Sequence, residues 1–265
     1  MRATSDVMKR IVPWACVVGL AVFPAVGCSD TSGSENTGGT PGTGGTGGTA
    51  GDGGSGGSVP DFATLFLTVG DGEGGVLEGA WFCESDAKDN CSTTNAEGRA
   101  TIDVEVPADQ RIMYTYGKDG WLSLLRTDMV DEMFTGNYRH FTLPDAWMAG
   151  EAERLGFPWP LEGTGVVEVA TGVAGAVLEL VPSSGAETRY YRDEDGVAHL
   201  ELEATTSDGV GGFIEVEPGM VEVRISGSAT NCAAGWGWPG SEPSTVQIPV
   251  RDNYVSWSSM LCEEQ

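Results

Sequence analysis

The residue types that most often carry out chemistry are sparse in this sequence. The chain has 2 histidines, His140 and His199, which lie far apart, each in a strand-like run. A histidine-based metal site or a Ser-His-Asp triad needs such side chains to converge. Carboxylates are abundant, but many, such as Glu201 and Glu203, alternate with apolar residues as on the solvated face of a strand. We therefore predict no catalytic residue, no metal site and no cofactor.

Two acidic turns are the remaining candidates for a metal. Residues 193–196 (Asp-Glu-Asp-Gly) and 71–74 (Asp-Gly-Glu-Gly) each place side-chain oxygens close together. Neither follows the spacing of an EF-hand, because Val197 occupies the next alternate ligand position of the first turn. Tight hairpin turns use the same residue types. We predict turns at both places, and calcium binding is the alternative.

Trp236 and Trp238 give the clearest binding signal. They lie in the segment Gly-Trp-Gly-Trp-Pro-Gly at residues 235–240, just after Cys232. Indole rings on an ordered loop can stack on the apolar faces of sugars, and loops on a rigid β-scaffold are common binding sites. The alternative is that the two rings close the end of a β-sandwich beside a disulfide bond.

The N-terminus has the pattern of an export signal. Basic residues at positions 2, 9 and 10 flank an apolar run, residues 11–23, that is too short to span a bilayer. The run ends at Ala25-Val26-Gly27-Cys28, which resembles the lipobox of bacterial lipoproteins, although leucine usually stands at the place of Ala25. The resemblance implies removal of residues 1–27 and diacylation of the Cys28 sulfur. We therefore predict that the chain is held on a membrane through the lipid on Cys28.

The residue after Cys28 and the segment that follows indicate where the anchored chain works. In lipoproteins an aspartate after the lipidated cysteine is a signal for the inner membrane, and this chain has Ser29 there. We therefore expect an exported protein anchored to the outer membrane of a Gram-negative bacterium. Residues 31–58 are almost wholly Gly, Thr and Ser, so we predict that 28–58 form a disordered tether with a root-mean-square span of about 30 Å.

The charge of the chain excludes one class of partner. The sequence has 14 Lys+Arg and 39 Asp+Glu, and without residues 1–27 it has 11 and 38, a net charge near −27. Nucleic acids are bound through clusters of basic residues. We therefore expect no nucleic-acid partner, and acidity that serves solubility outside the cell.

Six cysteines set the covalent framework. One leaves with the signal peptide and one carries the lipid, which leaves four in an oxidising compartment, where pairing is expected. Three connectivities are open, and a zinc site is disfavoured because no Cys-x-x-Cys pair is present. Because two of the four lie early and two lie late in the chain, we favour one bridge in each half. The predicted pairs are Cys83 with Cys91 and Cys232 with Cys262.

The hydrophobic pattern beyond residue 59 predicts the fold class. Apolar residues alternate with polar ones in short runs, for example at 102–106 and 221–225. Such runs, separated by turns, are typical of antiparallel β-sandwiches. One helix is expected from Asp145 to Leu155, with Pro144 at its first turn and Gly156 as its stop. We predict an all-β protein with a first unit at 59–143, a helical connector at 144–163 and a second unit at 164–265.

The two units resemble each other. Residues 93–98 (Thr-Thr-Asn-Ala-Glu-Gly) match 205–210 (Thr-Thr-Ser-Asp-Gly-Val), and 79–82 (Gly-Ala-Trp-Phe) match 175–178 (Gly-Ala-Val-Leu). This order of a Gly-Ala strand, a threonine-rich edge, an acidic-Gly turn and a strand ending near Pro-Gly resembles the carboxypeptidase regulatory-like domain, a transthyretin-like β-sandwich. The second unit fits better than the first. The family name implies no peptidase activity, because these domains only accompany catalytic zinc domains.

Three functions remain open at the level of sequence. The first is a non-catalytic, lipid-anchored structural or interaction module of the cell envelope. The second is a carbohydrate-binding or adhesion module that uses Trp236 and Trp238, with a glycan or an envelope protein as partner. The third, and weakest, is a carboxylate-based hydrolase.

Overall fold

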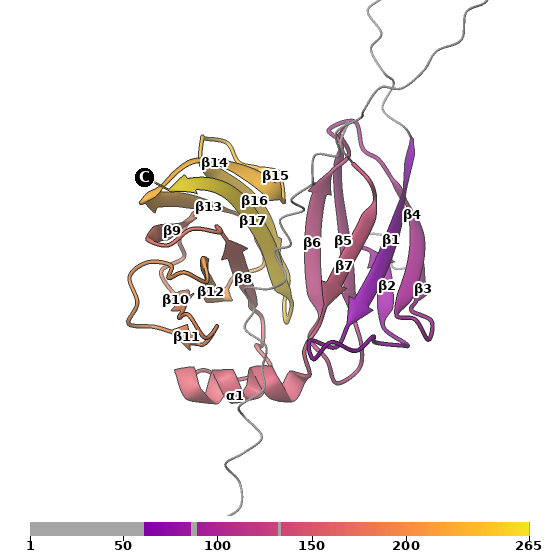
Figure 1. Cartoon of the computed structure of the whole chain (residues 1–265), viewed down its shortest axis with the longest axis horizontal. Coiled ribbons are helices and arrows are strands. Elements are labelled where there is room, and N and C mark those ends of the chain that lie inside the picture. The colour runs from indigo at the N-terminus through magenta and orange to yellow at the C-terminus, as the bar shows by residue number, and fades with distance from the viewer. Residues whose placement is uncertain (1–60, 86–88, 132–133, 265) are drawn as a thin grey trace, which may run out of the picture. The chain divides into compact units, whose positions relative to one another are not determined.

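The computed structural model describes residues 61–85, 89–131 and 134–264. In these ranges the chain forms three sheets and one helix (Figure 1). The predicted all-β class is thus confirmed. Cys28, the signal peptide and the tether lie outside the described residues.

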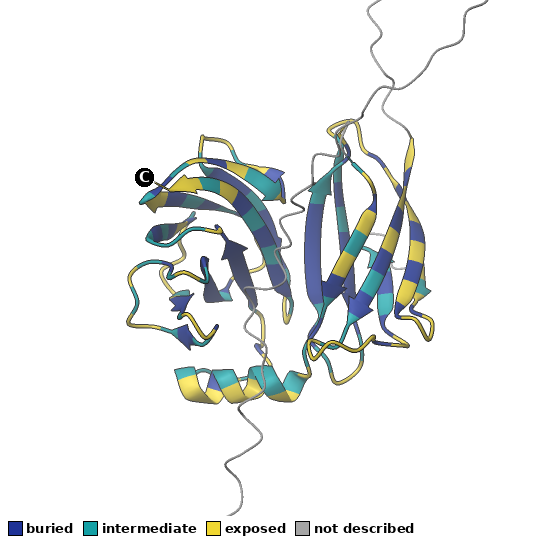
Figure 2. Ribbon diagram, in the orientation of Figure 1, coloured by how far each residue is buried: buried dark blue, intermediate teal, exposed yellow. Residues whose placement is uncertain are grey.

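The smallest sheet contains three strands and forms one wall of the first unit. Its strand order is β4 (Arg99–Glu105), β1 (Phe62–Gly70) and β7 (Asn137–Phe141). Buried and exposed residues alternate along β1 and β4, as the banding in Figure 2 shows. The buried set, which includes Leu65, Leu67 and Val69, faces the first hydrophobic core. The period-two pattern of the sequence therefore does place one face inside and one in water.

The largest sheet has ten strands and runs through both predicted units. Its path is β11 (Ala198–His199), β10 (Thr188–Arg192), β12 (Val210–Val216), β8 (Gly165–Ala170), β17 (Val255–Glu264), β6 (Leu124–Met129), β5 (Arg111–Gly117), β2 (Trp81–Glu84) and β3 (Cys91–Thr93), and β14 (Ala229–Trp236) also pairs with β17. The third sheet has the order β15 (Trp238–Pro239), β16 (Thr245–Val250), β13 (Gly219–Gly227) and β9 (Ala176–Val181).

Three strand pairs are parallel, whereas the alternating pattern predicts antiparallel pairing. β1 pairs with β7 in parallel, and β17 lies parallel to both β8 and β6. Through Val255, paired with Leu124 on β6 and with Val166 on β8, the C-terminal strand joins the two halves of the ten-stranded sheet. A sequence pattern indicates which residues are buried but not which strand is the neighbour, so this link was missed.

Two hydrophobic cores lie on opposite faces of the ten-stranded sheet. Val166 belongs to the first core and Val167, the next residue of β8, belongs to the second. Successive side chains of a strand point to opposite faces, and all six residues of β8 are buried. The first core also receives Tyr190 and Ile214 from the second unit. The second core lies wholly within the second predicted unit, whereas the first core draws on both, so the domain boundaries at 143 and 164 stay a prediction.

The helix α1 (Asp145–Leu155) is the one that the sequence predicts. Pro144 stands at its N-cap, and Gly156 ends it in the left-handed conformation, donating its N–H to the Ala152 carbonyl. Glycine reaches this conformation at little steric cost, which explains the stop. α1 lies beside β11 (Figure 1).

The internal repeat has a counterpart in hydrogen bonding. Thr94 donates its hydroxyl hydrogen to the Leu77 carbonyl and accepts the N–H of Ala80. Thr205 does the same with the Val173 carbonyl and the N–H of Ala176. Both threonines are buried.

These equivalent bonds correct the alignment of the repeat. The predicted alignment pairs residue 93 with 205, whereas the hydrogen bonds pair Thr94 with Thr205. The register of that block was therefore wrong by one residue, while the match of 79–82 with 175–178 agrees with the contacts of Ala80 and Ala176.

Candidate binding site

Trp238 is a buried contact between β15 and the first unit, not an exposed ring. Its side chain is 8% exposed, and its indole Nε1 donates a hydrogen bond to the Asp128 carbonyl on β6 over 3.1 Å. The guanidinium carbon of Arg111 lies 5.5 Å from the centre of the ring. The expected pair of stacking platforms is therefore not formed, because Trp238 packs where the strands of the two units meet.

Trp236, at the end of β14, keeps 42% of its surface exposed. The two tryptophans separate because Gly237 between them has a φ of 118°, and a Cβ there would come within 2.4 Å of the Ser258 hydroxyl oxygen. The Trp236 ring lies 5.4 Å from the ring of Trp257 and edge-on to His140 at 6.1 Å. One of the two rings that the sequence singled out is thus accessible to a ligand.

Behind Trp236, His140 lies in a stack of tyrosines. Its ring is nearly parallel to Tyr116 at 5.1 Å and to Tyr138 at 5.6 Å, and its Nε2 lies 2.9 Å from the Tyr114 hydroxyl. Burial, aided by the positive charge of Arg126, holds the pKa of His140 well below its usual range. His140 is therefore a neutral, buried ring. It does not have the water contact that a proton donor or a metal ligand at an open site would have.

Asp128 and Tyr138 form a hydrogen-bonded pair beside this stack. The Tyr138 hydroxyl donates to the Asp128 Oδ2 over 2.6 Å, and the N–H of Met129 donates to Oδ1 over 2.8 Å. Burial raises the pKa of Asp128, and these hydrogen bonds oppose the rise. Both carboxylate oxygens are thus occupied by groups of the protein itself.

Arg126, on β6, lies under the same aromatic group. The residue is 7% exposed, and its guanidinium carbon is 3.8 Å from the centre of the Trp257 ring. Tyr116 has a pKa that burial raises and that the charge of Arg126 lowers in part. Within the described part of the chain, the Nε and Nη1 atoms of Arg126 meet no hydrogen-bond acceptor. No sequence signal marked this arginine, because pairing of β6 with β17 brings it to Trp257.

A second buried group lies under α1. Tyr190 and Arg192 of β10 both donate to the Glu168 Oε2 on β8, the tyrosine over 2.8 Å. Gly212 of β12 lies between them in the sheet, paired with Tyr190 on one side and with Glu168 on the other. Its missing side chain lets the tyrosine ring cross β12 to reach the carboxylate. The group is an internal ion pair with a satisfied carboxylate oxygen.

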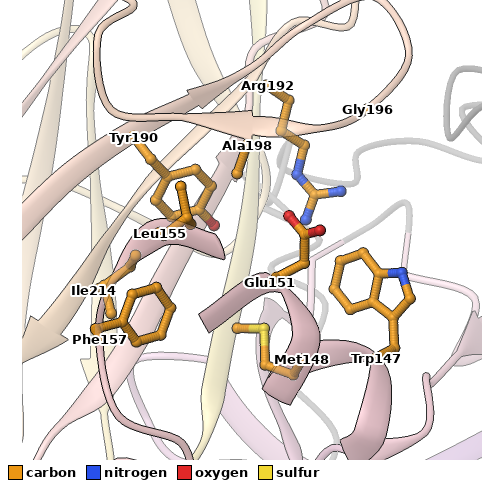
Figure 3. A pocket seen from close by; sticks show the side chains of 10 residues that line it. All are labelled: Trp147, Met148, Glu151, Leu155, Phe157, Tyr190, Arg192, Gly196, Ala198 and Ile214. Carbon is orange, nitrogen blue, oxygen red and sulfur yellow. The ribbon is translucent and has the colours of Figure 1, made fainter. Parts of the chain in front are cut away.

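The hollow beside this ion pair is too small for an organic ligand. It is lined by Trp147, Glu151, Tyr190 and Arg192, among others, and has about 20 Å³ open to the centre of a water molecule (Figure 3). One ordered water needs about 10–15 Å³ by that measure. The hollow therefore has room for about one water molecule.

His199 lies on β11, paired with Tyr191 of β10, and its ring reaches the turn between these two strands. Its Nε2 lies 2.8 Å from the Asp193 Oδ2 and its Nδ1 lies 3.0 Å from the Glu201 Oε1. The hydrogen bond with Asp193 raises the pKa of His199. The Asp193 Oδ1 accepts the N–H groups of Asp195 and Val197, which is how a tight turn uses an aspartate. No cluster of three or more metal-ligating side chains occurs among the residues that the structure describes.

The four cysteines of the described ranges form two disulfide bonds. Cys83 on β2 joins Cys91 on β3, directly opposite in the ladder. Cys232 on β14 joins Cys262 on β17. In the same ranges no helix is long and apolar enough to cross a membrane.

No family model matches the chain, and no curated protein matches it by sequence. The resemblance to the carboxypeptidase regulatory-like domain therefore stays a prediction. Solved structures with some likeness include the Bacillus anthracis TIE protein (13% identity, TM-score 0.25, 76% of this chain and 34% of that one). Others are a streptococcal ancillary pilin (13%, 0.23, 76% and 63%) and a minor pilin of the Gram-positive pathogen Streptococcus agalactiae (11%, 0.25, 76% and 96%).

The chain thus spans about a third of the length of the TIE protein and less than two thirds of the ancillary pilin. TM-scores this low support no conclusion about function. What the arrangement can do follows from its own contacts, which combine an accessible indole with a buried arginine.

Proposed function

We propose that this chain is a non-catalytic module of the cell envelope, anchored by a lipid at Cys28. The observation that carries the proposal is the order of segments in the sequence: a basic and apolar leader, the lipobox-like Ala25-Val26-Gly27-Cys28, and then a Gly/Thr/Ser tether up to residue 58. Two acyl chains hold a protein on a bilayer far more firmly than one. The tether then lets the β-rich part act away from the membrane surface.

The contacts of the β-rich part are those of a structural or interaction module. Two disulfide bonds brace it, one in each predicted unit. The buried carboxylate of Glu168 is bonded to Tyr190 and Arg192, and the hollow beside it has room for about one water molecule. A carboxylate-based hydrolase needs two facing carboxyl groups and space for a sugar between them. We therefore do not propose the hydrolase.

Replacement of Cys28 tests the anchor. The Cys28→Ser variant should leave the membrane fraction for the soluble fraction and lose labelling by a palmitate analogue. Cys16→Ser, within the leader, is the matched control and should behave like the wild type. Equal partitioning and equal labelling of the wild type and the Cys28→Ser variant would refute lipidation. Separation of inner and outer membranes on a density gradient then tests the expected outer-membrane location.

A further inference from the structure

The described residues leave part of the buried guanidinium of Arg126 without a hydrogen-bond acceptor. Only 7% of the residue is exposed, and an arginine side chain stays charged in a protein interior. Two of its donor atoms, Nε and Nη1, meet no acceptor in the described ranges. An unpaired buried donor on a charged group is costly. The arrangement therefore favours the binding of an anion at this place.

The neighbouring polar groups are already engaged with one another. Asp128 accepts from Tyr138 and from the Met129 N–H. The Tyr114 hydroxyl is paired with His140, whose lowered pKa keeps it neutral. Arg126 is therefore the positive group of this aromatic cluster, and no neighbouring cation shares its role among the contacts described above.

The surroundings of Arg126 say what kind of anion fits. Its guanidinium carbon lies 3.8 Å from the centre of the Trp257 ring. The Trp236 ring, with 42% of the residue exposed, lies 5.4 Å from the Trp257 ring. Flat indole faces stack on the apolar face of a sugar ring, whereas a guanidinium pairs with a carboxylate. Both groups side by side match a sugar that carries a carboxylate.

The net charge of the chain limits the size of such a ligand. At a formal charge of −25, the protein repels long polyanions. An acidic peptide would bring several carboxylates and no flat ring to place on Trp236. A short oligosaccharide with few acidic groups meets both conditions.

We propose that Arg126, Trp236 and Trp257 form a binding site for an acidic sugar of the uronic acid class. The sugar carboxylate accepts hydrogen bonds from Arg126, and the pyranose ring packs on Trp236, the most exposed ring of the group. The site concerns the folded β-rich part and does not depend on the lipid anchor. Failure of one proposal thus leaves the other standing.

Calorimetric titration of the full-length chain in detergent tests the site. Trigalacturonate is the probe, and galactotriose, which lacks the carboxylates, is the neutral counterpart. We expect trigalacturonate to bind and galactotriose to bind at least tenfold more weakly. Arg126→Met and Trp236→Ala should each weaken trigalacturonate binding at least tenfold. Arg224→Gln is the matched control, because Arg224 is an exposed arginine that pairs with Glu179 and Glu242.

Several results would overturn the proposal. The first is that trigalacturonate does not bind at up to about 10 mM. The second is that Arg126→Met binds trigalacturonate as well as the wild type does. The third is that a triglutamate peptide binds as tightly as trigalacturonate, which would leave no role for the sugar ring. Thermal unfolding accompanies each titration. Methionine fills the space of the arginine stem without a buried charge, so we expect Arg126→Met to unfold no earlier than the wild type. If Arg126→Met does not fold, the binding of trigalacturonate by Trp236→Ala, a variant at an exposed position, tests the proposal instead.

Discussion

Gly212→Ala should destabilise the protein by blocking the path of Tyr190 across β12. A Cβ at Gly212 would lie 2.2 Å from the Val167 carbonyl oxygen on the neighbouring strand and 2.9 Å from the Tyr190 hydroxyl. The first of these neighbours is backbone, so relief requires β8 to move away from β12. The second is the group that donates to Glu168 over 2.8 Å.

The size of the effect follows from these two contacts. Extra atoms forced into a packed interior cost about 1–3 kcal/mol. Loss of a hydrogen bond to a charged group adds about 1.5–3 kcal/mol. We therefore expect the free energy of unfolding to fall by about 2.5–6 kcal/mol in Gly212→Ala, which for a protein of this size lowers Tm by about 5–24 °C.

Two further variants separate the causes. Tyr190→Phe removes the hydroxyl without adding volume and should cost only the hydrogen-bond part, about 1.5–3 kcal/mol. Gly150→Ala, on the exposed face of α1 with no atom within 4 Å of the added Cβ, should stabilise the protein by about 0.5–1 kcal/mol. Urea unfolding followed by circular dichroism gives all three values. A Gly212→Ala variant as stable as the wild type would refute the argument. If Tyr190→Phe lost as much stability as Gly212→Ala, no steric contribution from the added Cβ would remain.

Three other perturbations have expected outcomes. Trp238→Ala should lose about 3–5 kcal/mol of stability as a core substitution, whereas Trp236→Ala should lose less than about 1.5 kcal/mol; equal losses in urea unfolding would contradict their different burial. Because the pKa of His199 is raised in the folded state, His199 should stabilise the protein below its unfolded pKa of about 6.5 and lose this effect as pH rises through the folded value. The Tm of His199→Gln should thus lie below that of the wild type at pH 5.5 and match it at pH 8.5. The opposite trend would refute the assignment. Replacement of both Cys232 and Cys262 by serine opens a bridge that spans 30 residues and should cost roughly 3.6 kcal/mol by loop-closure entropy; unchanged chemical stability would argue against that bridge.

The sequence predicts those parts of the fold that depend on local pattern. The alternation along β1 and β4 is visible in the residues themselves, and so are the start and stop of α1 at Pro144 and Gly156. Each of these signals is contained in a few neighbouring residues. The repeat was also visible, because Gly-Ala strands and threonine-rich edges recur as short blocks. Its register was wrong by one residue, since Thr93 and Thr94 look alike in sequence and differ only in which of them is buried.

The candidate site could not be predicted in this way, because distant pairing creates it. Arg126 lies in a run with no motif, and it meets Trp257 because β17 pairs with β6 up to Ser256 and Leu125, the residues just before them. Trp238 is buried for the same reason, through its hydrogen bond to Asp128 on β6. In the sequence Trp236 and Trp238 look equally able to be exposed. The contact between the units buries Trp238 and leaves Trp236 exposed. A sequence carries the residue types of such a site, whereas the parallel alignment of the C-terminal strand decides which of them meet.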